Sequence, residues 1–327
     1  MLNVGLIGLG TEWEPCYQPA LKKLRHRVRV RSVFSPVITR AEQAAAELGC
    51  DVSPGILALM ERDDVRAVLV LDGAWFGEAP ARFACQAGKP AFLAGQFGTR
   101  LPLADQVLRR AAESGVTLMP DFRHRYTPAT SRLRELIATR LGRPLSIAID
   151  AGPAGPRPED ADFANEARHV LALAIDWSSN LVGTPPAAVR AAPQAGEDSG
   201  RSARAPQVQV EFRRPSAGGA AAQASIRFDC AQNASAVSEA SHSPPLILRA
   251  EVRCAKGAGL IEGSQQLTWD CDGERKAESL VAERTEVEVM LDHFTRRVVG
   301  GLIPVPTLDD LCRAFQLAHA ALACGEP

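Results

Sequence analysis

Asn3-Val4-Gly5-Leu6-Ile7-Gly8-Leu9-Gly10 joins a short apolar run directly to a glycine turn at the start of the chain. A run of this length is typical of a buried strand, and a helix-like segment follows the turn. Glycines between a first strand and a first helix let backbone N–H groups approach a diphosphate. The stretch therefore predicts the strand, turn and helix that open a dinucleotide-binding domain. The alternative is a tight turn that binds nothing.

The first 120 residues continue the alternation of strands and helices. Strands are expected at residues 3–7, 28–34, 67–71, 91–93 and 117–119. Between them, Thr39 and Glu42 resemble a capping box, while Gly88 and Gly115 fall where helices should end. Such alternation predicts right-handed βαβ units, hence a parallel sheet with helices on both faces. The expected fold class is α/β, with an N-terminal, doubly wound Rossmann sheet.

The pattern changes after residue 120. Helices are expected near residues 133–141 and 165–182, with a strand at 145–149 between them. Period-two alternation then marks strands around residues 208–212, 224–228, 248–254 and 267–269. One buried and one exposed face per strand predicts an open, mostly antiparallel sheet in a C-terminal α/β domain. Two helices close the chain, and the second begins at Thr307 with Asp310 as its capping-box partner.

We therefore expect two domains. Residues 1–122 form the dinucleotide-binding domain and residues 123–327 form a substrate and dimerisation domain. The last helix, about residues 307–325, can pack against the dinucleotide-binding domain.

Composition excludes several classes of protein. The 327 residues are 46% hydrophobic and 23% charged, with a formal net charge of −1. These values are ordinary for a globular protein and give no basic surplus for nucleic acid. No apolar run approaches the ~20 residues of a membrane span, and no signal peptide is expected. The eight cysteines lack metal-ligand spacing, so we expect no metal site and reduced thiols in a cytoplasmic protein.

A run of motifs resembles one known family. The motifs, in order, are Gly8-Leu9-Gly10-Thr11-Glu12-Trp13, Tyr17-Gln18-Pro19-Ala20-Leu21, Arg40-Ala41, Ala87-Gly88-Lys89, Arg125-Tyr126-Thr127-Pro128, His293-Phe294 and Thr307-Leu308-Asp309-Asp310. They are similar to those of the glucose–fructose oxidoreductase/inositol dehydrogenase (Gfo/Idh/MocA) family. The resemblance spans nearly the whole chain. It implies NAD or NADP as cofactor, a carbohydrate-like ligand and a homo-oligomer formed through the C-terminal sheet.

The resemblance also implies which residues hold the diphosphate. Gly8, Gly10, Thr11 and Glu12 belong to the turn, and Trp13 stands at the position of its third glycine. That position normally permits close packing of helix on strand. Either the indole faces outward and the dinucleotide still binds, or it narrows the diphosphate slot.

The ribose end of the expected cofactor site departs from the family. Ser35 stands where an acidic residue usually binds the ribose, and Arg31 and Arg40 nearby could favour the extra phosphate of NADP. Asp72 and Gly73 follow the strand at 67–71 and precede two aromatic residues. These aromatics either stack on a nicotinamide or a sugar, or close the domain core.

The residues that carry chemistry in the family are the least similar. Gly95 stands where the family's Glu-Lys-Pro motif has its lysine, and Lys89 lies at the far end of that strand. The family's histidine three residues before an aspartate is replaced by Leu173, while the aspartate remains as Asp176. His169, one helical turn before Leu173, is either a displaced general base or a structural histidine.

Another group lies where the two domains are expected to meet. Asp121, His124 and Tyr126 follow the last parallel strand, at the sheet edge where ligands bind in open α/β folds. They either serve a different acid–base reaction or form an ion-pair cluster.

Three functions fit these residues. The first is a nicotinamide-dependent oxidoreductase of a sugar, polyol or related hydroxy compound with rearranged catalytic groups. The second is a catalytically silent relative that acts as a sensor or partner subunit. The third is a different enzyme that uses Asp121, His124 or His169 beside a retained cofactor.

Overall fold

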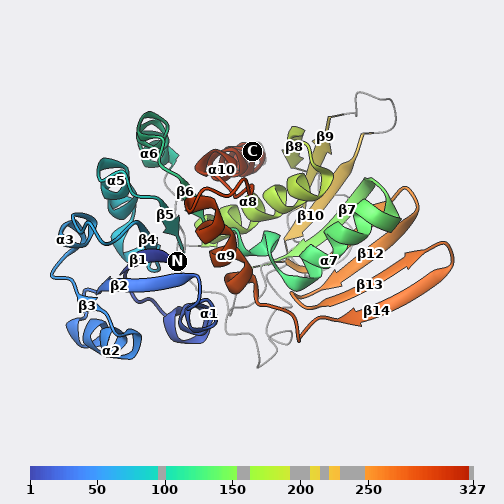
Figure 1. Cartoon of the computed structure of the whole chain (residues 1–327). Helices are drawn as coiled ribbons and strands as arrows, with labels where there is room; N and C mark the ends of the chain where they lie inside the picture. The colour runs from blue at the N-terminus through green and yellow to red at the C-terminus, as the bar shows by residue number, and fades with distance from the viewer. Residues whose placement is uncertain (95–100, 153–162, 192–206, 214–220, 229–246, 324–327) are drawn as a thin grey trace. The chain divides into compact units, whose positions relative to one another are not determined.

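The chain divides into two compact units, one formed by residues 1–123 and 285–312 and the other by residues 124–284 and 313–327. The computed structural model describes residues 1–94, 101–152, 163–191, 207–213, 221–228 and 247–323 (Figure 1). Each unit is built around its own sheet.

The first unit contains a six-stranded sheet in the order β3-β2-β1-β4-β5-β6. Its strands are β1 (Leu2–Ile7), β2 (Val28–Phe34), β3 (Asp51–Val52), β4 (Ala67–Val70), β5 (Ala91–Leu93) and β6 (Leu118–Pro120). All five strand pairs are parallel. This confirms the predicted doubly wound Rossmann sheet, whose order reverses between β1 and β4.

Helices cover both faces of this sheet because right-handed crossovers run one way from β1 to β3 and the other way from β3 to β6. Their bounds are α1 (Gln18–Lys23), α2 (Ile38–Leu48), α3 (Ile56–Met60), α4 (Gly73–Phe76), α5 (Ala79–Gln86), α6 (Leu101–Ser114) and α9 (Glu286–Val298). α1 and α2 lie on one face, and α3, α5 and α6 on the other (Figure 1). Gly88 and Gly115 have positive φ angles just after α5 and α6, which confirms them as helix ends.

Helix α9 packs on α1 although more than 250 residues separate them in the chain. Arg27 lies 3.1 Å from Asp292, and Lys23 pairs with Glu288. The ring of Phe294 is 6.1 Å from that of Phe92 in β5. α9 is therefore part of the core of the first unit.

One predicted helix start is correct and another is wrong. Thr307 and Asp310 exchange backbone-to-side-chain hydrogen bonds of 3.1 and 3.3 Å at the start of α10 (Leu308–Ala323), as expected of a capping box. Thr39 caps nothing, because α2 already begins at Ile38. The Ser35 hydroxyl accepts the Val37 N–H at 3.3 Å and so sets the chain direction before α2.

The second unit contains an eight-stranded sheet in the order β14-β13-β12-β11-β7-β10-β9-β8. Its strands are β7 (Pro144–Ala151), β8 (Pro186–Ala191), β9 (Gln207–Phe212), β10 (Gln223–Phe228), β11 (Ile247–Cys254), β12 (Gly257–Glu262), β13 (Gln266–Cys271) and β14 (Glu274–Ser279). Among the described strands of this second sheet, only β7 and β10 pair in parallel. The expected open, mostly antiparallel sheet is confirmed.

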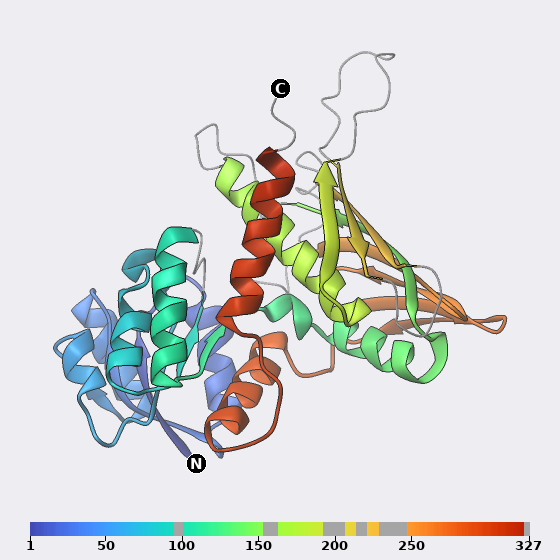
Figure 2. The same cartoon turned by 90° about the horizontal axis from the view of Figure 1, so that it is seen from above.

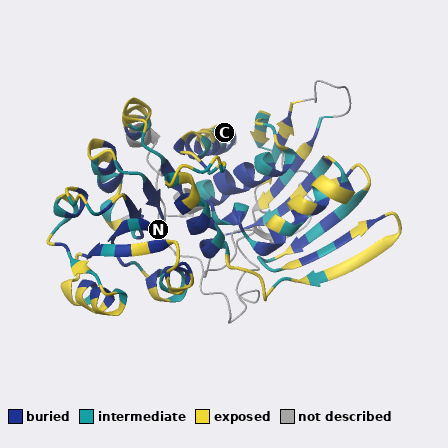
Figure 3. Ribbon diagram, in the orientation of Figure 1, coloured by how far each residue is buried: buried dark blue, intermediate teal, exposed yellow. Residues whose placement is uncertain are grey.

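One face of this sheet is covered by α7 (Pro128–Leu136), which continues into a π-helical turn (Ile137–Leu141), and by α8 (Phe163–Val182) (Figure 2). The indole of Trp177 in α8 donates to the Thr130 hydroxyl of α7 at 3.0 Å. Strand residues on that face are buried, whereas the edge strand β14 is mostly exposed (Figure 3). No helix in the described part of the chain is long and apolar enough to span a membrane.

Candidate functional site

The glycine turn after β1 lies at the point where the strand order of the first sheet reverses. Gly8 has a φ of +77°, a conformation that favours glycine. Its N–H donates to the Phe34 carbonyl at 2.8 Å. Within the described residues, the N–H groups of Leu9, Gly10 and Thr11 donate no hydrogen bond. These N–H groups fit the acceptor oxygens of a diphosphate.

Close packing explains why glycine is required in and beside this turn. A Cβ atom on Gly8 would lie 2.7 Å from the Asp72 Cβ and 2.8 Å from the Phe76 ring. One on Gly10 would lie 3.2 Å from the Leu71 carbonyl oxygen, and one on Gly73 only 2.4 Å from that of Ala94. The glycines of the turn after β1 therefore pack against the turn after β4, and Gly73 packs against the end of β5, at the sheet edge where a Rossmann domain holds its ligand.

Trp13 does not face outward, since only 3% of its surface is exposed. It begins a π-helical turn, Trp13–Tyr17, that precedes α1. The Tyr17 N–H bonds the Glu12 carbonyl five residues earlier, at 3.2 Å. A wider first turn gives the indole room at a position where a glycine would allow closer packing. The outward alternative for Trp13 is wrong.

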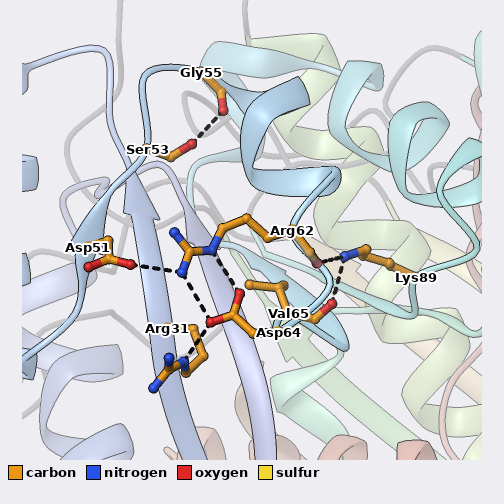
Figure 4. A network of polar contacts seen from close by, with 8 residues as sticks. All are labelled: Arg31, Asp51, Ser53, Gly55, Arg62, Asp64, Val65 and Lys89. Carbon is orange, nitrogen blue, oxygen red and sulfur yellow. Dashed lines mark hydrogen bonds and ion pairs between the residues drawn. The ribbon is translucent and has the colours of Figure 1, made fainter.

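The three residues expected near the ribose, Ser35, Arg40 and Arg31, each bind a different partner. Ser35 is buried and its hydroxyl is bonded to Val37. Arg40 lies 3.6 Å from Glu14 at the surface. Arg31 donates to Asp64 at 2.9 Å, and Asp64 also binds Arg62 (Figure 4). Arg40 thus pairs with a residue of the π-helical turn, and Arg31 pairs with Asp64.

The segment after β4 separates its two aromatic residues. The Asp72 carboxylate caps α4 by accepting the Trp75 N–H at 3.4 Å. Trp75 is 72% exposed. Phe76 packs against Phe34, with ring centroids 6.0 Å apart. Phe76 thus helps to close the core, and Trp75 is the aromatic that a ligand can reach.

Asp121 belongs to a network with three other residues of the first unit. Its carboxylate accepts from Arg123 and, at 2.9 Å, from the Tyr17 hydroxyl. Arg123 also donates to both carboxylate oxygens of Glu12, at 2.8 and 2.7 Å. Burial alone raises the pKa of Asp121, but Arg123 outweighs it and the net pKa is lowered. Asp121 is therefore an ionised member of an ion-pair cluster.

Asp176 in α8 has an imidazole partner that does not come from α8. His124 Nε2 lies 2.8 Å from its Oδ2, and Arg125 binds both of its oxygens, with an Nε–Oδ2 distance of 2.7 Å. His124 and Asp176 are both buried. Burial raises the pKa of Asp176, but Arg125 and His124 lower it further, so the carboxyl is ionised. An ionised carboxylate fixes the orientation of the imidazole.

Three other residues of the second unit that the sequence singles out lie in different environments. Leu173 is buried in α8, one turn before Asp176. His169 packs on Phe315, with ring centroids 5.5 Å apart. Burial raises the pKa of Tyr126 to about 12, so its hydroxyl is protonated at neutral pH.

Lys89 lies at the amino end of β5, as the sequence predicts. Its ammonium donates to the carbonyls of Arg62 and Val65 at 2.5 and 2.6 Å (Figure 4). These bonds hold it at the sheet edge opposite the glycine turn. Gly95 lies outside the described residues, and within them no group of three or more metal-ligating side chains gathers.

A comparison with family models matches most of the Rossmann sheet's part of the chain. The family model for oxidoreductases with an NAD-binding Rossmann fold, Gfo/Idh/MocA, matches residues 2–122. The matched range contains the whole six-stranded sheet and the glycine turn. No curated protein matches the chain by sequence.

Solved structures share the fold over both units. UDP-N-acetylglucosamine 3-dehydrogenase from Acidithiobacillus ferrooxidans is 21% identical, with a TM-score of 0.70 over 99% of this chain and 97% of that one. Aldose-aldose oxidoreductase from Caulobacter crescentus, complexed with glycerol, is 17% identical, with a TM-score of 0.75 and the same coverage. At these identities the likeness shows the fold alone.

Sequence reasoning missed three residues of the two networks. Arg123 and Tyr17 bind Asp121, and Arg125 binds Asp176. Tyr17 and Arg125 lie in the quoted family motifs, but their partners are 104 and 51 residues away. No local pattern indicates such pairings.

Proposed function

We propose that this protein is an NAD(P)-dependent oxidoreductase that acts on a hydroxyl group of a sugar, polyol or related compound. The observation that carries the proposal is the family match of residues 2–122, joined to the glycine turn at the strand-order reversal. The carbohydrate-like substrate is inferred from the neighbours named for an aldose and for UDP-N-acetylglucosamine.

The proposed cofactor site follows the carboxyl ends of β1, β2 and β4. The turn from Gly8 to Trp13 holds the diphosphate, and Ser35 with Arg40 lies toward the adenosine ribose. Asp72 and Gly73 lie toward the expected nicotinamide end, and Gly95, the remaining residue expected there, lies outside the described residues. A bound nicotinamide would supply the hydride acceptor.

The chain must also take up the hydroxyl proton that is released with the hydride. We assign this step to His124. A charged Asp176, 2.8 Å from its Nε2, orients the ring and stabilises the imidazolium that forms. His169, Tyr126 and Asp121 are weaker candidates: His169 packs on Phe315, Tyr126 is protonated, and Asp121 is bound by Arg123.

The first experiment is a fluorescence titration with NADH and with NADPH, followed by turnover assays on a panel of sugars and inositols. Saturable binding of one nucleotide and oxidation of a panel member support the proposal. If neither nucleotide binds at millimolar concentration, the proposed function is wrong. In an active protein, His124→Asn should lower kcat by roughly 10²–10⁴, whereas the matched His169→Asn variant should keep kcat within about threefold. The reverse order would assign the proton to His169.

A second candidate function is that of a catalytically silent sensor or partner subunit. It is favoured by Gly95 and Leu173, which stand at the family's lysine and histidine positions. The double variant Gly95→Lys, Leu173→His separates the two functions. Activity that appears only in this variant supports the silent relative. Robust wild-type turnover defeats it.

Self-association through the second sheet and a cytoplasmic location belong to the same proposal. The sheet face away from α7 and α8 carries polar pairs such as Arg227–Asp150 at 3.3 Å and Gln209–Ser225 at 3.1 Å. Light scattering should find a homo-oligomer that Arg227→Glu weakens. A wild-type monomer at micromolar concentration would contradict it. The six described cysteines are free thiols, which suits a reducing compartment.

A further inference from the structure

Glu12 has an unusual place for a carboxylate, because it lies two residues after Gly10 in the turn expected to receive a diphosphate. A free carboxylate there would repel the phosphates. It could also accept the N–H groups of the turn itself, as acidic side chains do at helix starts. The structure shows both carboxylate oxygens occupied by Arg123 instead.

Arg123 is also held in place by Asp121 and Tyr17. Its backbone N–H and its Nε donate to Asp121 Oδ1 at 3.0 and 3.2 Å. One terminal nitrogen reaches Asp121 Oδ2 at 2.5 Å and the Tyr17 hydroxyl at 3.2 Å. The Asp121 carboxylate is only 4% exposed and that of Glu12 is 29% exposed. The guanidinium is therefore fixed by the buried acid and presents a rigid fork to the partly exposed one.

The cluster carries a net charge of −1. Glu12 and Asp121 contribute two negative charges and Arg123 one positive charge. Tyr17 stays neutral, since burial and the neighbouring Asp121 raise the pKa of its hydroxyl well above the usual value. Without Arg123 the charge beside the turn would be −2.

We propose that Arg123 is a positioning residue of the dinucleotide site, which holds the Glu12 carboxylate so that the N–H groups of the turn remain available to a diphosphate. Glu12 is then the internal partner of Arg123 and makes no contact with the nucleotide. The inference rests on the proposed function, because it concerns the same site.

The test measures the Kd of NADH, NADPH and ADP-ribose for three variants. Arg123→Met frees the Glu12 carboxylate, and like charges about 6 Å apart at an effective dielectric constant of about 20 change affinity by roughly a hundredfold. We expect Kd to rise by roughly tenfold to a hundredfold. Glu12→Gln removes the charge and should leave Kd equal or lower. The double variant Glu12→Gln, Arg123→Met should return to within about threefold of Glu12→Gln, since the carboxylate beside the turn that Arg123 restrains is no longer present.

Two further measurements separate charge from folding. The loss in Arg123→Met should shrink between about 50 mM and about 500 mM NaCl, because salt screens a partly exposed charge. Arg132→Met is the matched control, since it removes another guanidinium that binds a carboxylate at two points, on Glu278; its Kd should not change. If Arg123→Met does not fold because Asp121 is left buried and charged, Asp121→Asn, Arg123→Met replaces it with the same expected loss.

Each outcome of these binding measurements supports or overturns the inference about Arg123. Equal affinity of wild type and the Arg123 variant, or no rescue by Glu12→Gln, overturns the inference and leaves the proposed function standing. A Glu12→Gln variant that binds more than about tenfold more weakly means that Glu12 contacts the nucleotide itself, which also overturns it. A wild type that binds none of the three nucleotides overturns the proposed function and the inference together.

Discussion

Replacing Trp13 by alanine should destabilise the protein strongly, although alanine or glycine is the residue that the nucleotide fingerprint itself favours at this position. The indole is 3% exposed and begins the π-helical turn. Truncating a buried tryptophan to alanine typically costs about 3–5 kcal/mol, because transfer energy is lost and a cavity is left. A loss of 1 kcal/mol lowers the Tm of a unit of 150–250 residues by about 2–4 °C. The expected fall in Tm is therefore roughly 6–20 °C.

The assay is thermal unfolding followed by circular dichroism, together with urea unfolding to obtain the free energy. Trp75→Ala is the matched control, because the same side chain is 72% exposed there and is not expected to change stability by more than about 0.5 kcal/mol. If Trp13→Ala loses less than about 1 kcal/mol, the indole does not fill the space under the turn. The explanation of the wide first turn would then be wrong.

Three further predictions concern single interactions. Asp176→Asn should cost about 3–5 kcal/mol at pH 7 by leaving Arg125 buried without its counter-charge. Because the pKa of Asp176 is lower in the folded than in the unfolded protein, the wild type keeps this stability above the unfolded pKa and loses it as the pH falls from there through the lowered folded pKa. Acid unfolding should therefore be flatter in the variant, and parallel pH curves would contradict the assignment. Thr307→Ala should lose about 1 kcal/mol through the capping box, whereas Thr39→Ala should lose no cap; equal losses in urea unfolding would show otherwise. Lys89→Met should lower stability by about 1–3 kcal/mol and leave the Kd of NADH unchanged, because its ammonium serves two carbonyls at the opposite sheet edge; a changed Kd would refute this placement.

The sequence predicts the elements whose pattern follows from burial. The five strands of the Rossmann sheet that read as apolar runs are present within a residue or two of their expected bounds. The strands without such a pattern were missed. β12 (Gly257–Glu262) is glycine-rich, and β14 (Glu274–Ser279) is a mostly exposed edge strand with no apolar face. Hydrophobic periodicity cannot indicate a strand that has little to bury.

The two capping-box candidates show why local motifs are ambiguous. Thr307 and Thr39 are each followed three residues later by an acidic residue. Only Thr307 caps a helix, because Ser35 and Val37 start α2 earlier. A local pattern indicates which capping hydrogen bonds are possible, and the preceding residues determine which of them form.

The candidate site depends still more on long-range placement. The sequence picks out Glu12, Asp121, His124 and Asp176 one by one. It does not show that Arg123 joins the first two across 111 residues or that His124 meets Asp176 across 52. These pairings exist because strand ends that are far apart in the chain meet at one edge of a sheet, or because a helix packs beside a turn.

The edge strand β14 of the second sheet has a consequence for aggregation. β14 reads Glu-Arg-Lys-Ala-Glu-Ser, so an approaching strand from another molecule would have to desolvate four charges of both signs. Such an edge resists the strand addition that begins fibrils. Replacing Arg275 and Lys276 with valine or threonine would remove this protection without touching the core.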